Sequence, residues 1–430
     1  MTTTRAKAVQ TTAWLALTVS LILASASPSQ SAPGGFFGEI GFEETWTDNL
    51  FLSSVEESDW ISRPFLELNL GPFSGLIPYY YASGYLYSEN RELNSLAHRA
   101  GLDYTKPFGD GRHDFVAGAA YRGAIHVEDT KELDYHQGEA DLGFKIRPLP
   151  NLMIGPSLSA SYLTFPEADD LSFVEAGSRL VVNLSLKSRT TFRLSGRLDY
   201  KQFLQEIQTS ESEMDSSELS HPSSAGNGDR GNGDGGADGD SGQDGSDRGD
   251  MSGKAGQMGS LANTDSVEAA QALFSLRIAQ GIGLRVGAYI EGFYRLNLLD
   301  PPRYAEGVLP EVDREFFDDR YGYEGPGGEA QVSVILADGL RLIARGRGEL
   351  REYESREALD EDGLPLSPSE DRSDRRMAGT ATLSYSRGFD LAFPASLDLS
   401  LSYGYTRNIS NDAYYDAEEN SASATVSIGW

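Results

Sequence analysis

The sequence predicts an all-β protein, a transmembrane antiparallel up-and-down β-barrel of about 16 strands. Segments that alternate apolar and polar residues recur roughly every 20 residues after position 35. The connections between them are short and long in turn, and the last segment, ATVSIGW, alternates up to a terminal tryptophan. Because lipid does not tolerate an open sheet edge, such a strand is expected to close a barrel. Strand counts of 14 or 18 fit the same pattern, and the expected location is a bacterial outer membrane.

The first 26 residues are predicted to be a secretory signal peptide. Arg5 and Lys7 precede an apolar stretch over 13–26, and Ala26 suits the cleavage position. The barrel is therefore predicted to occupy residues 27–430. The sequence contains no cysteine, which excludes a lipidated cysteine, a disulfide and a thiolate metal site. No later stretch holds 18 continuous apolar residues, so no membrane-spanning helix is expected.

Each predicted strand shows period-two alternation and is bounded by turn residues. Leucine, valine, isoleucine, tyrosine and phenylalanine supply most of the apolar positions. In chain order the predicted strands are 36–47, 59–70, 76–87, 95–105, 113–126, 135–147, 151–163, 172–187, 190–203, 267–280, 283–297, 322–336, 340–353, 375–387, 395–407 and 419–430.

The connections between these strands alternate strictly in length. Short turns on the periplasmic side and long loops outside are typical of bacterial transmembrane barrels, and an even strand count puts both ends in the periplasm. The predicted turns are 71–75, 107–112, 148–150, 188–189, 281–282, 337–339 and 388–394. The predicted outer loops are 48–58, 88–94, 127–134, 164–171, 204–266, 298–321, 354–374 and 408–418.

The longest outer loop contains an Asp/Gly/Ser-rich insert at 207–265. It has almost no apolar residue, so it cannot bury a core and is predicted to be a disordered extracellular segment. Its aspartates raise the question of calcium. The insert lacks the recurring apolar position of calcium-binding nonapeptide repeats and the closing glutamate of an EF-hand loop. A solvated tether is therefore favoured over ordered calcium sites.

The segment 395–407 shows most clearly which strand face meets lipid. Its apolar face should contact lipid and its polar face should contact the interior. The apolar set is Leu397, Leu399, Leu401, Tyr403 and Tyr405, and it alternates with Asp398, Ser400, Ser402, Gly404 and Thr406. In the last strand Val426, Ile428 and Trp430 share the apolar face, and we interpret them as the assembly signal read by the barrel-assembly machinery.

The same parity places many charged side chains in the lumen, because a charge facing lipid near the midplane costs about 2–4 kcal/mol. Two interpretations stay open. The arginines line an aqueous pore and favour anions, or they pair with carboxylates on neighbouring strands; a turn at 337–339 would put Glu329 opposite Arg347. The pore-lining candidates are Arg341, Arg345, Arg347, Arg351, Arg285, Arg193, Arg197, Glu291 and Asp199.

Motifs for catalysis are weak. His126 and His136 flank the acidic loop at 127–134, which is the only spot that resembles a histidine–carboxylate site. We interpret these groups as polar residues at a wet barrel rim, and we predict no catalytic residue, no metal site and no cofactor. A formal net charge of −29 argues against nucleic acid as a partner.

The segment from Thr45 to Gly71 resembles the opening of a family of outer-membrane beta-barrel porins. Members often carry a T-D-N triplet on the first outer loop and an S-D pair before the second strand, and here these are Thr47, Asp48, Asn49, Ser58 and Asp59. Some relatives lie in exopolysaccharide or capsule export loci. The resemblance implies an outer-membrane barrel and leaves the transported substrate open, and the Asp/Gly insert departs from the family outline.

The function expected from the sequence is therefore an outer-membrane channel for passive passage or export of polar solutes, with polysaccharide among the candidate cargoes. The alternative is a structural or adhesive surface barrel with a plugged lumen and no transport. The expected partners are outer-membrane lipid, the assembly machinery and a polar or anionic solute. The sequence does not indicate an oligomeric state.

Overall fold

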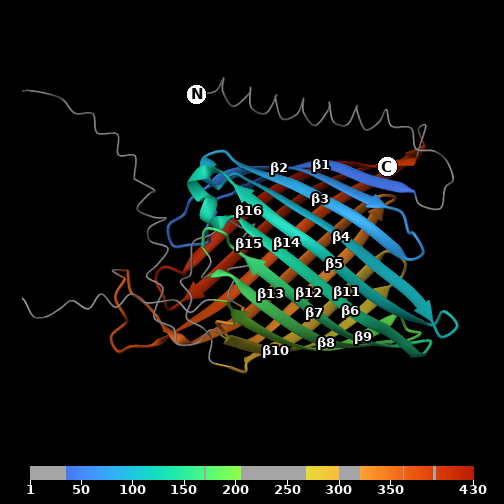
Figure 1. The fold of residues 1–430 in the computed structure, drawn as a ribbon. Helices are drawn as coiled ribbons and strands as arrows, with labels where there is room; N and C mark the ends of the chain where they lie inside the picture. Colours follow the sequence, from blue (N-terminus) through green and yellow to red (C-terminus); the bar gives the residue numbers. More distant parts are fainter. Residues whose placement is uncertain (1–34, 169–170, 205–267, 300–319, 362, 391–393) are drawn as a thin grey trace, which may run out of the picture.

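The computed structural model describes residues 35–168, 171–204, 268–299, 320–361, 363–390 and 394–430. Within these ranges the chain forms a closed barrel of antiparallel strands, seen from the side in Figure 1. The predicted signal peptide at 1–26 and the predicted insert at 207–265 lie outside the described residues. Among the residues that are described, no helix is long and apolar enough to cross a membrane.

Sixteen strands make the barrel wall in the described part of the chain. In chain order they are β1 Phe36–Thr47, β2 Asp59–Leu70, β3 Leu76–Tyr87, β4 Ser95–Phe108, β5 His113–His126, β6 Tyr135–Leu149, β7 Leu152–Thr164, β8 Phe173–Ser185, β9 Thr190–Phe203, β10 Glu268–Ile282, β11 Val286–Asn297, β12 Gly325–Ala337, β13 Leu340–Glu357, β14 Asp371–Asp390, β15 Pro394–Ser410 and β16 Ala417–Gly429. The short 3-10 helices η1 Arg91–Leu93 and η2 Glu128–Leu133 lie in outer loops.

Every strand pairs antiparallel with its neighbours in the chain, and β1 pairs with β16 to close the sheet. The predicted up-and-down barrel of sixteen strands is confirmed. Short turns join the strands at the end where β1 begins and β16 ends, and longer connections join them at the opposite end (Figure 1). The alternation of connection length seen in the sequence therefore separates a periplasmic end from an extracellular end.

Several strand limits differ from the prediction. The turn between β10 and β11 comes later than expected, because Gly283 adopts a positive φ of 64° and Ile282 still pairs with Val286. Arg285 therefore lies in this periplasmic turn, where it is exposed, and not inside a strand as predicted. β13 and β14 are longer than expected, because their hairpin resumes pairing at Glu357 and Asp371 beyond an irregularity.

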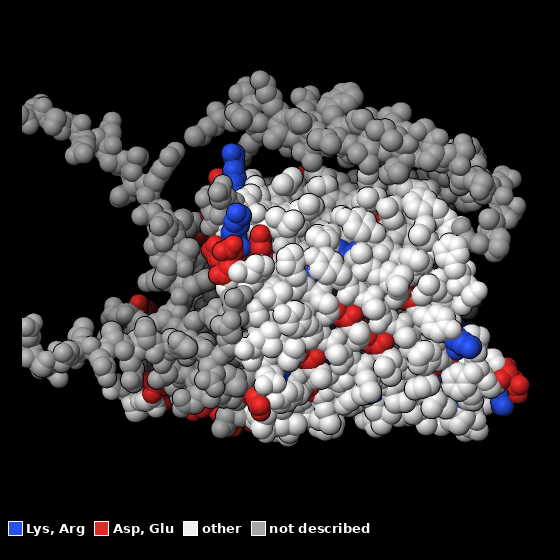
Figure 2. Space-filling model, in the orientation of Figure 1, with Lys and Arg blue, Asp and Glu red and all other residues white. Residues whose placement is uncertain are grey.

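The two faces of the wall differ in chemistry. Large apolar side chains such as Leu158, Leu194, Leu401 and Ile290 are more than half exposed on the outside. Figure 2 shows one side of the barrel that is mostly uncharged, with a few carboxylate atoms scattered across its middle and larger charged groups at its two ends. The alternate positions of the same strands carry most of the charged side chains and face the lumen.

The barrel closes where β1 meets β16. The backbone N–H of Gly38 donates to the carbonyl of Trp430 at 3.0 Å, and the Trp430 N–H donates back to Gly38 at 2.9 Å. The indole covers Gly38 so closely that an added Cβ there would lie 2.5 Å from the ring. Trp430 and Gly38 on β1 therefore pack tightly against each other at the periplasmic end.

The residues of the T-D-N triplet hold the first outer loop onto the last strand. The Asp48 carboxylate accepts hydrogen bonds from the backbone and side-chain nitrogens of Asn420 at 2.6 and 2.8 Å. Asn49 is fully buried and donates through Nδ2 to the carbonyls of Ser53 and Glu418 at 2.8 and 2.9 Å. The resemblance noted in the sequence thus rests on residues that close the extracellular end of the same seam.

Candidate functional site

The candidate site is the wall of the lumen formed by β8 to β13. Its clearest feature is the arginine ladder of β13, which we define as Arg341, Arg345, Arg347 and Arg351. All four lie on one strand face at odd positions, so they follow the lumen from its periplasmic half to its extracellular rim. Arg341 Nε donates to Ser333 Oγ at 2.7 Å.

Two carboxylates hold the upper three arginines of the ladder. Glu329 on β12 pairs with Arg345 and also accepts a hydrogen bond from the Tyr289 hydroxyl. Glu349 pairs with Arg347 at 2.9 Å and with Arg351. Both glutamates are buried. The ladder is therefore partly neutralised by acids behind it, while the guanidinium groups of Arg345 and Arg347 remain at the lumen surface and Arg351 is buried.

The predicted register of Glu329 is confirmed, but its predicted ion-pair partner is not. Glu329 lies directly opposite Arg347 in the β12–β13 ladder, yet its ion pair reaches diagonally to Arg345. Arg347 leans along its own strand to Glu349, and its guanidinium carbon lies 4.8 Å from the centre of the Phe293 ring. For Arg347, stacking on the Phe293 ring and the ion pair with Glu349 on its own strand therefore replace an ion pair with the directly opposite Glu329.

The remaining predicted candidates lie on β9 and β11. Arg197 Nε contacts Asp199 at 2.6 Å, and Arg197 Nη2 lies 3.6 Å from Glu175 on β8. Glu291 on β11 pairs with Arg277 on β10. Arg193 lies on the same face of β9 as Arg197 and makes no ion pair with any described residue.

The structure adds charged residues that were not singled out from the sequence. They are Arg179 and Glu175 on β8 and Arg277 on β10. A signal for them was present, because Arg179 precedes the exposed Leu180, and Arg277 stands between the apolar Leu276 and Ile278. Serine, alanine and glycine at several positions of both strands obscure this alternation.

One segment outside the strands enters the lumen just before β12. The Arg320 guanidinium forms an ion pair with Glu175 on β8, and the Arg320 carbonyl accepts a hydrogen bond from Arg295 Nη1 at 2.9 Å. Burial lowers the pKa of Arg320, but the Glu175 carboxylate, together with Tyr321 and Asp199, outweighs burial, so the pKa is raised. Burial raises the pKa of the neighbouring Tyr321 well above its ordinary value.

Arg320 and Tyr321 border a cavity of about 330 Å³ in the upper lumen. Its other walls come from β5 to β9 and combine acids, bases and hydroxyl groups. Lys201 lies at one side, with Nζ 3.9 Å from the ring centre of Phe173. The lining residues are Arg122, Gln137, Glu139, Ala140, Asp141, Ser159, Ala160, Ser161, Phe173, Glu175, Arg197, Lys201, Arg320 and Tyr321. The cavity is polar and can hold a hydrated solute.

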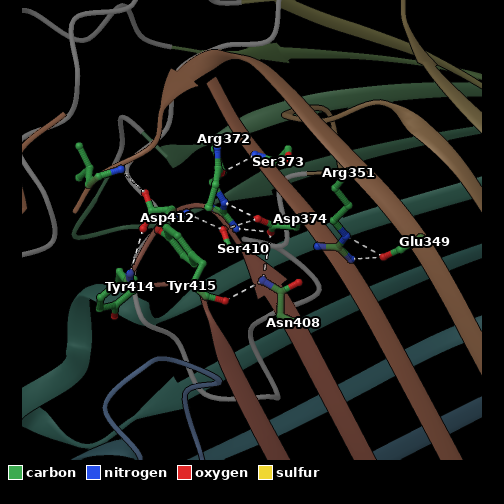
Figure 3. Close-up of polar contacts among 12 residues, drawn as sticks. Glu349, Arg351, Arg372, Ser373, Asp374, Asn408, Ser410, Asp412, Tyr414 and Tyr415 are labelled. Atoms are coloured by element: carbon green, nitrogen blue, oxygen red, sulfur yellow. Dashed lines mark hydrogen bonds and ion pairs between the residues drawn. The ribbon is translucent and has the colours of Figure 1, made fainter. Parts of the chain in front are cut away.

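The extracellular rim above the ladder is a hydrogen-bonded polar cluster, shown in Figure 3. Arg372 on β14 pairs with Asp374 at 2.7 Å and lies flat against two tyrosines, 3.4 Å from the ring centre of Tyr415 and 4.3 Å from that of Tyr353. Asp374 also accepts hydrogen bonds from Ser410 Oγ at 2.7 Å and Asn408 Nδ2 at 3.1 Å. Burial raises the pKa of Tyr415.

The two histidines of the 127–134 loop do not form a common site. His126 is buried, and its ring nitrogen lies 3.2 Å from Asp134. His136 projects from the opposite face of the wall, where its Nδ1 lies 2.6 Å from the Tyr121 hydroxyl. Within the described ranges, no three histidine, aspartate or glutamate side chains gather into a group that could hold a metal ion.

A closed sheet with an apolar exterior and a charged interior is suited to lipid outside and water inside. The chain is an outer-membrane β-barrel. Short turns mark its periplasmic end, and the polar cluster of Figure 3 lies at its extracellular rim.

No protein-family model and no curated protein matches the chain. The barrel is similar to the crystal structure of Acinetobacter baumannii OccAB1, with 10% identity, a TM-score of 0.42 and coverage of 92% of this chain and 96% of that one. It is similar to Pseudomonas aeruginosa OccK8 (OprE), with 9% identity, a TM-score of 0.44 and coverage of 92% and 98%. It is also similar to a bacterial polysaccharide outer membrane secretin, with 8% identity, a TM-score of 0.44 and coverage of 91% and 97%. The lumen has to be interpreted from its own residues.

Proposed function

We propose that the barrel is a passive channel for polar solutes with a preference for anions. The observation that carries this proposal is the excess of arginine over carboxylate along β8 to β13. The arginines on the lumen face of these strands are Arg179, Arg193, Arg197, Arg277, Arg295, Arg341, Arg345, Arg347 and Arg351, against Glu175, Asp199, Glu291, Glu329 and Glu349. Uncancelled arginine charge in a pore attracts anions.

The rest of the lumen moderates this preference. The wall of β4 to β6 carries Asp103, Glu139 and Asp141, of which Glu139 pairs with Arg99 at 2.7 Å. The wall of β14 to β16 presents hydroxyl groups such as Thr382 and Ser402, which lie 2.9 Å apart. Hydroxyl and carboxylate groups bind hydrated polar molecules, so the lumen suits solutes larger than a simple ion. An acidic polysaccharide strand is one cargo of this kind.

The proposal is tested by reversal potentials across a KCl gradient in planar bilayers. The wild-type barrel should prefer chloride, and the preference should weaken as ionic strength rises, because salt screens the field of the arginines. The triple variant Arg341→Ser, Arg345→Ser and Arg347→Ser should shift the reversal potential toward that of a non-selective pore.

A matched triple variant controls for the loss of three positive charges. Arg112, Arg189 and Arg285 lie in periplasmic turns, so replacing all three by serine removes the same charge outside the middle of the lumen. This control should move the reversal potential less than the ladder variant does. Absence of conductance in the wild type would instead support a plugged structural or adhesive barrel. Equal shifts in the two triple variants would show that the ladder does not set selectivity.

A further inference from the structure

Four arginines occupy opposite positions across three neighbouring strands, between the middle of the lumen and its periplasmic half. Arg179 on β8 lies directly opposite Arg197 on β9, and Arg193 on β9 lies directly opposite Arg277 on β10. Directly opposite side chains in an antiparallel sheet have Cβ atoms roughly 4.5–5.5 Å apart, and like charges in that position destabilise the sheet. The barrel thus contains two like-charge pairs, four residues apart along β9, which its fold does not require.

Carboxylates form ion pairs with only two of these four arginines. Arg197 has Asp199 at 2.6 Å and Glu175 at 3.6 Å, and Arg277 has Glu291. Glu175 is also engaged by Arg320.

The side chains of Arg179 and Arg193 have no ion pair and no hydrogen bond to any described residue. In the β8–β9 ladder Arg193 lies opposite Asn183, four residues from Arg179 along β8, so the two arginines belong to neighbouring strands of one wall. These two guanidinium groups therefore keep their donors free for a ligand.

The position of the two arginines fits a binding site rather than a rim. Arg179 is the middle residue of the 13-residue strand β8, and its side chain is exposed to the lumen. Arg193 lies nearer the periplasmic end of β9, on the same face as Arg197. A solute that crosses the barrel along this wall has to pass both groups.

The chemistry of the pair selects a multiply charged oxyanion. Guanidinium groups bind phosphate through two parallel hydrogen bonds, and they keep their charge at any physiological pH. A phosphate group carries a charge of about −1.5 to −2 at pH 7, so one phosphate can relieve the repulsion between two arginines. Chloride carries a single charge and has no pair of oxygens that could accept two parallel hydrogen bonds.

We propose that Arg179 and Arg193 form a phosphate-binding subsite within the lumen, used by a free phosphate or by the phosphate ester of a larger polar solute. This inference deepens the channel function proposed above and rests on it for the route that the ligand takes. Binding at the subsite can be measured with or without conduction.

The first test measures chloride conductance in planar bilayers while inorganic phosphate is added. Phosphate should reduce the wild-type conductance in a saturable way, and a hexose phosphate should do so as well if the subsite accepts esters. The double variant Arg179→Ser, Arg193→Ser should weaken the block at least about tenfold, because it removes the charge-assisted hydrogen bonds that hold the phosphate.

The matched control is the double variant Arg341→Ser, Arg345→Ser, which removes two arginines from the ladder. It should change ion selectivity and leave the phosphate block near its wild-type strength. An equal loss of block in both double variants would mean that phosphate responds to the total charge of the lumen, and the subsite would be wrong.

A second measurement separates this inference from the channel proposal. Inorganic phosphate should raise the temperature at which the wild-type barrel in detergent loses its folded, fast-migrating form, and the Arg179→Ser, Arg193→Ser variant should lose that shift. A conducting wild type with neither block nor stabilisation would overturn the subsite alone. A silent barrel that phosphate still stabilises would overturn the channel and keep the subsite.

Discussion

Replacing Trp430 with aspartate is expected to remove most of the folded barrel from the outer membrane. The change keeps the backbone pair with Gly38 but deletes the indole that covers it. It also places a carboxylate on a lipid-facing position near the periplasmic interface, where an aromatic ring is favoured. The folded fraction is read from unboiled gels, on which a folded barrel migrates differently from the heated chain.

The contact between β1 and β16 can also be disrupted by a substitution in β1. A leucine at Gly38 cannot coexist with the indole, because even its Cβ would lie 2.5 Å from a ring carbon. Gly38→Leu should therefore reduce folding as Trp430→Asp does. Gly292 also faces lipid, and nothing lies within 4 Å of its added Cβ, so Gly292→Leu is the matched control and should fold normally.

A comparison of folding in cells with refolding of the purified protein distinguishes two roles for Trp430. If purified Trp430→Asp refolds into lipid vesicles as well as the wild type but is missing from cells, the tryptophan acts in recognition by the assembly machinery. If refolding fails in vesicles too, the tryptophan acts at the seam. Normal folding of both Trp430→Asp and Gly38→Leu in cells would contradict the importance of this contact.

The strands were predictable because lipid and water impose the same alternation on every one of them. A residue such as Leu401 or Arg345 has its face fixed by polarity, and a slip of one residue would put charge into lipid. Turn positions were less predictable. The β10–β11 turn depends on the positive φ of Gly283, and the sequence offered Gly281 as an equally good turn residue.

Contacts inside the lumen were predictable only in part. The register that sets Glu329 opposite Arg347 follows from the turn length, but the choice of Arg345 as ion-pair partner depends on side-chain stacking against Phe293. Arg320 and Tyr321 belong to a connection without periodicity. Nothing in the sequence indicated that they would reach Glu175 and the cavity beside it.

The roles of the motif residues also required the structure. In the sequence the T-D-N triplet and the S-D pair only suggested a family. In the fold, Asp48 and Asn49 fasten the first outer loop to β16, and Asp59 fastens the second outer loop to β2. Such hydrogen bonds depend on loop conformation, which alternation of apolar and polar residues does not encode.

Replacing Asp59 with alanine is expected to cause the largest loss of stability among single changes at the extracellular end. Asp59 is 2% exposed at the start of β2. Its Oδ1 accepts hydrogen bonds from the backbone of Trp60 at 2.6 Å, Ser88 at 3.0 Å and Glu89 at 3.0 Å, and from Ser88 Oγ at 2.8 Å. Its Oδ2 accepts two more from Asn90, both at 3.0 Å.

Alanine at position 59 would leave these donors without their acceptor. An unsatisfied buried donor costs about 1–3 kcal/mol, and water can reach some of this group once the loop loosens, so a total loss on the order of 3 kcal/mol is expected. The measurement is urea unfolding of the barrel in lipid vesicles, with added protease to report opening of the loop at 88–94.

Asp48→Ala is the matched control. Among the described residues, the Asp48 carboxylate accepts hydrogen bonds only from Asn420, so its loss should cost less stability. Asp59→Asn keeps one carbonyl oxygen and should fall between alanine and the wild type. Wild-type stability and protease resistance in Asp59→Ala would show that the second outer loop is held by its apolar contacts around Tyr87 and Leu93 instead.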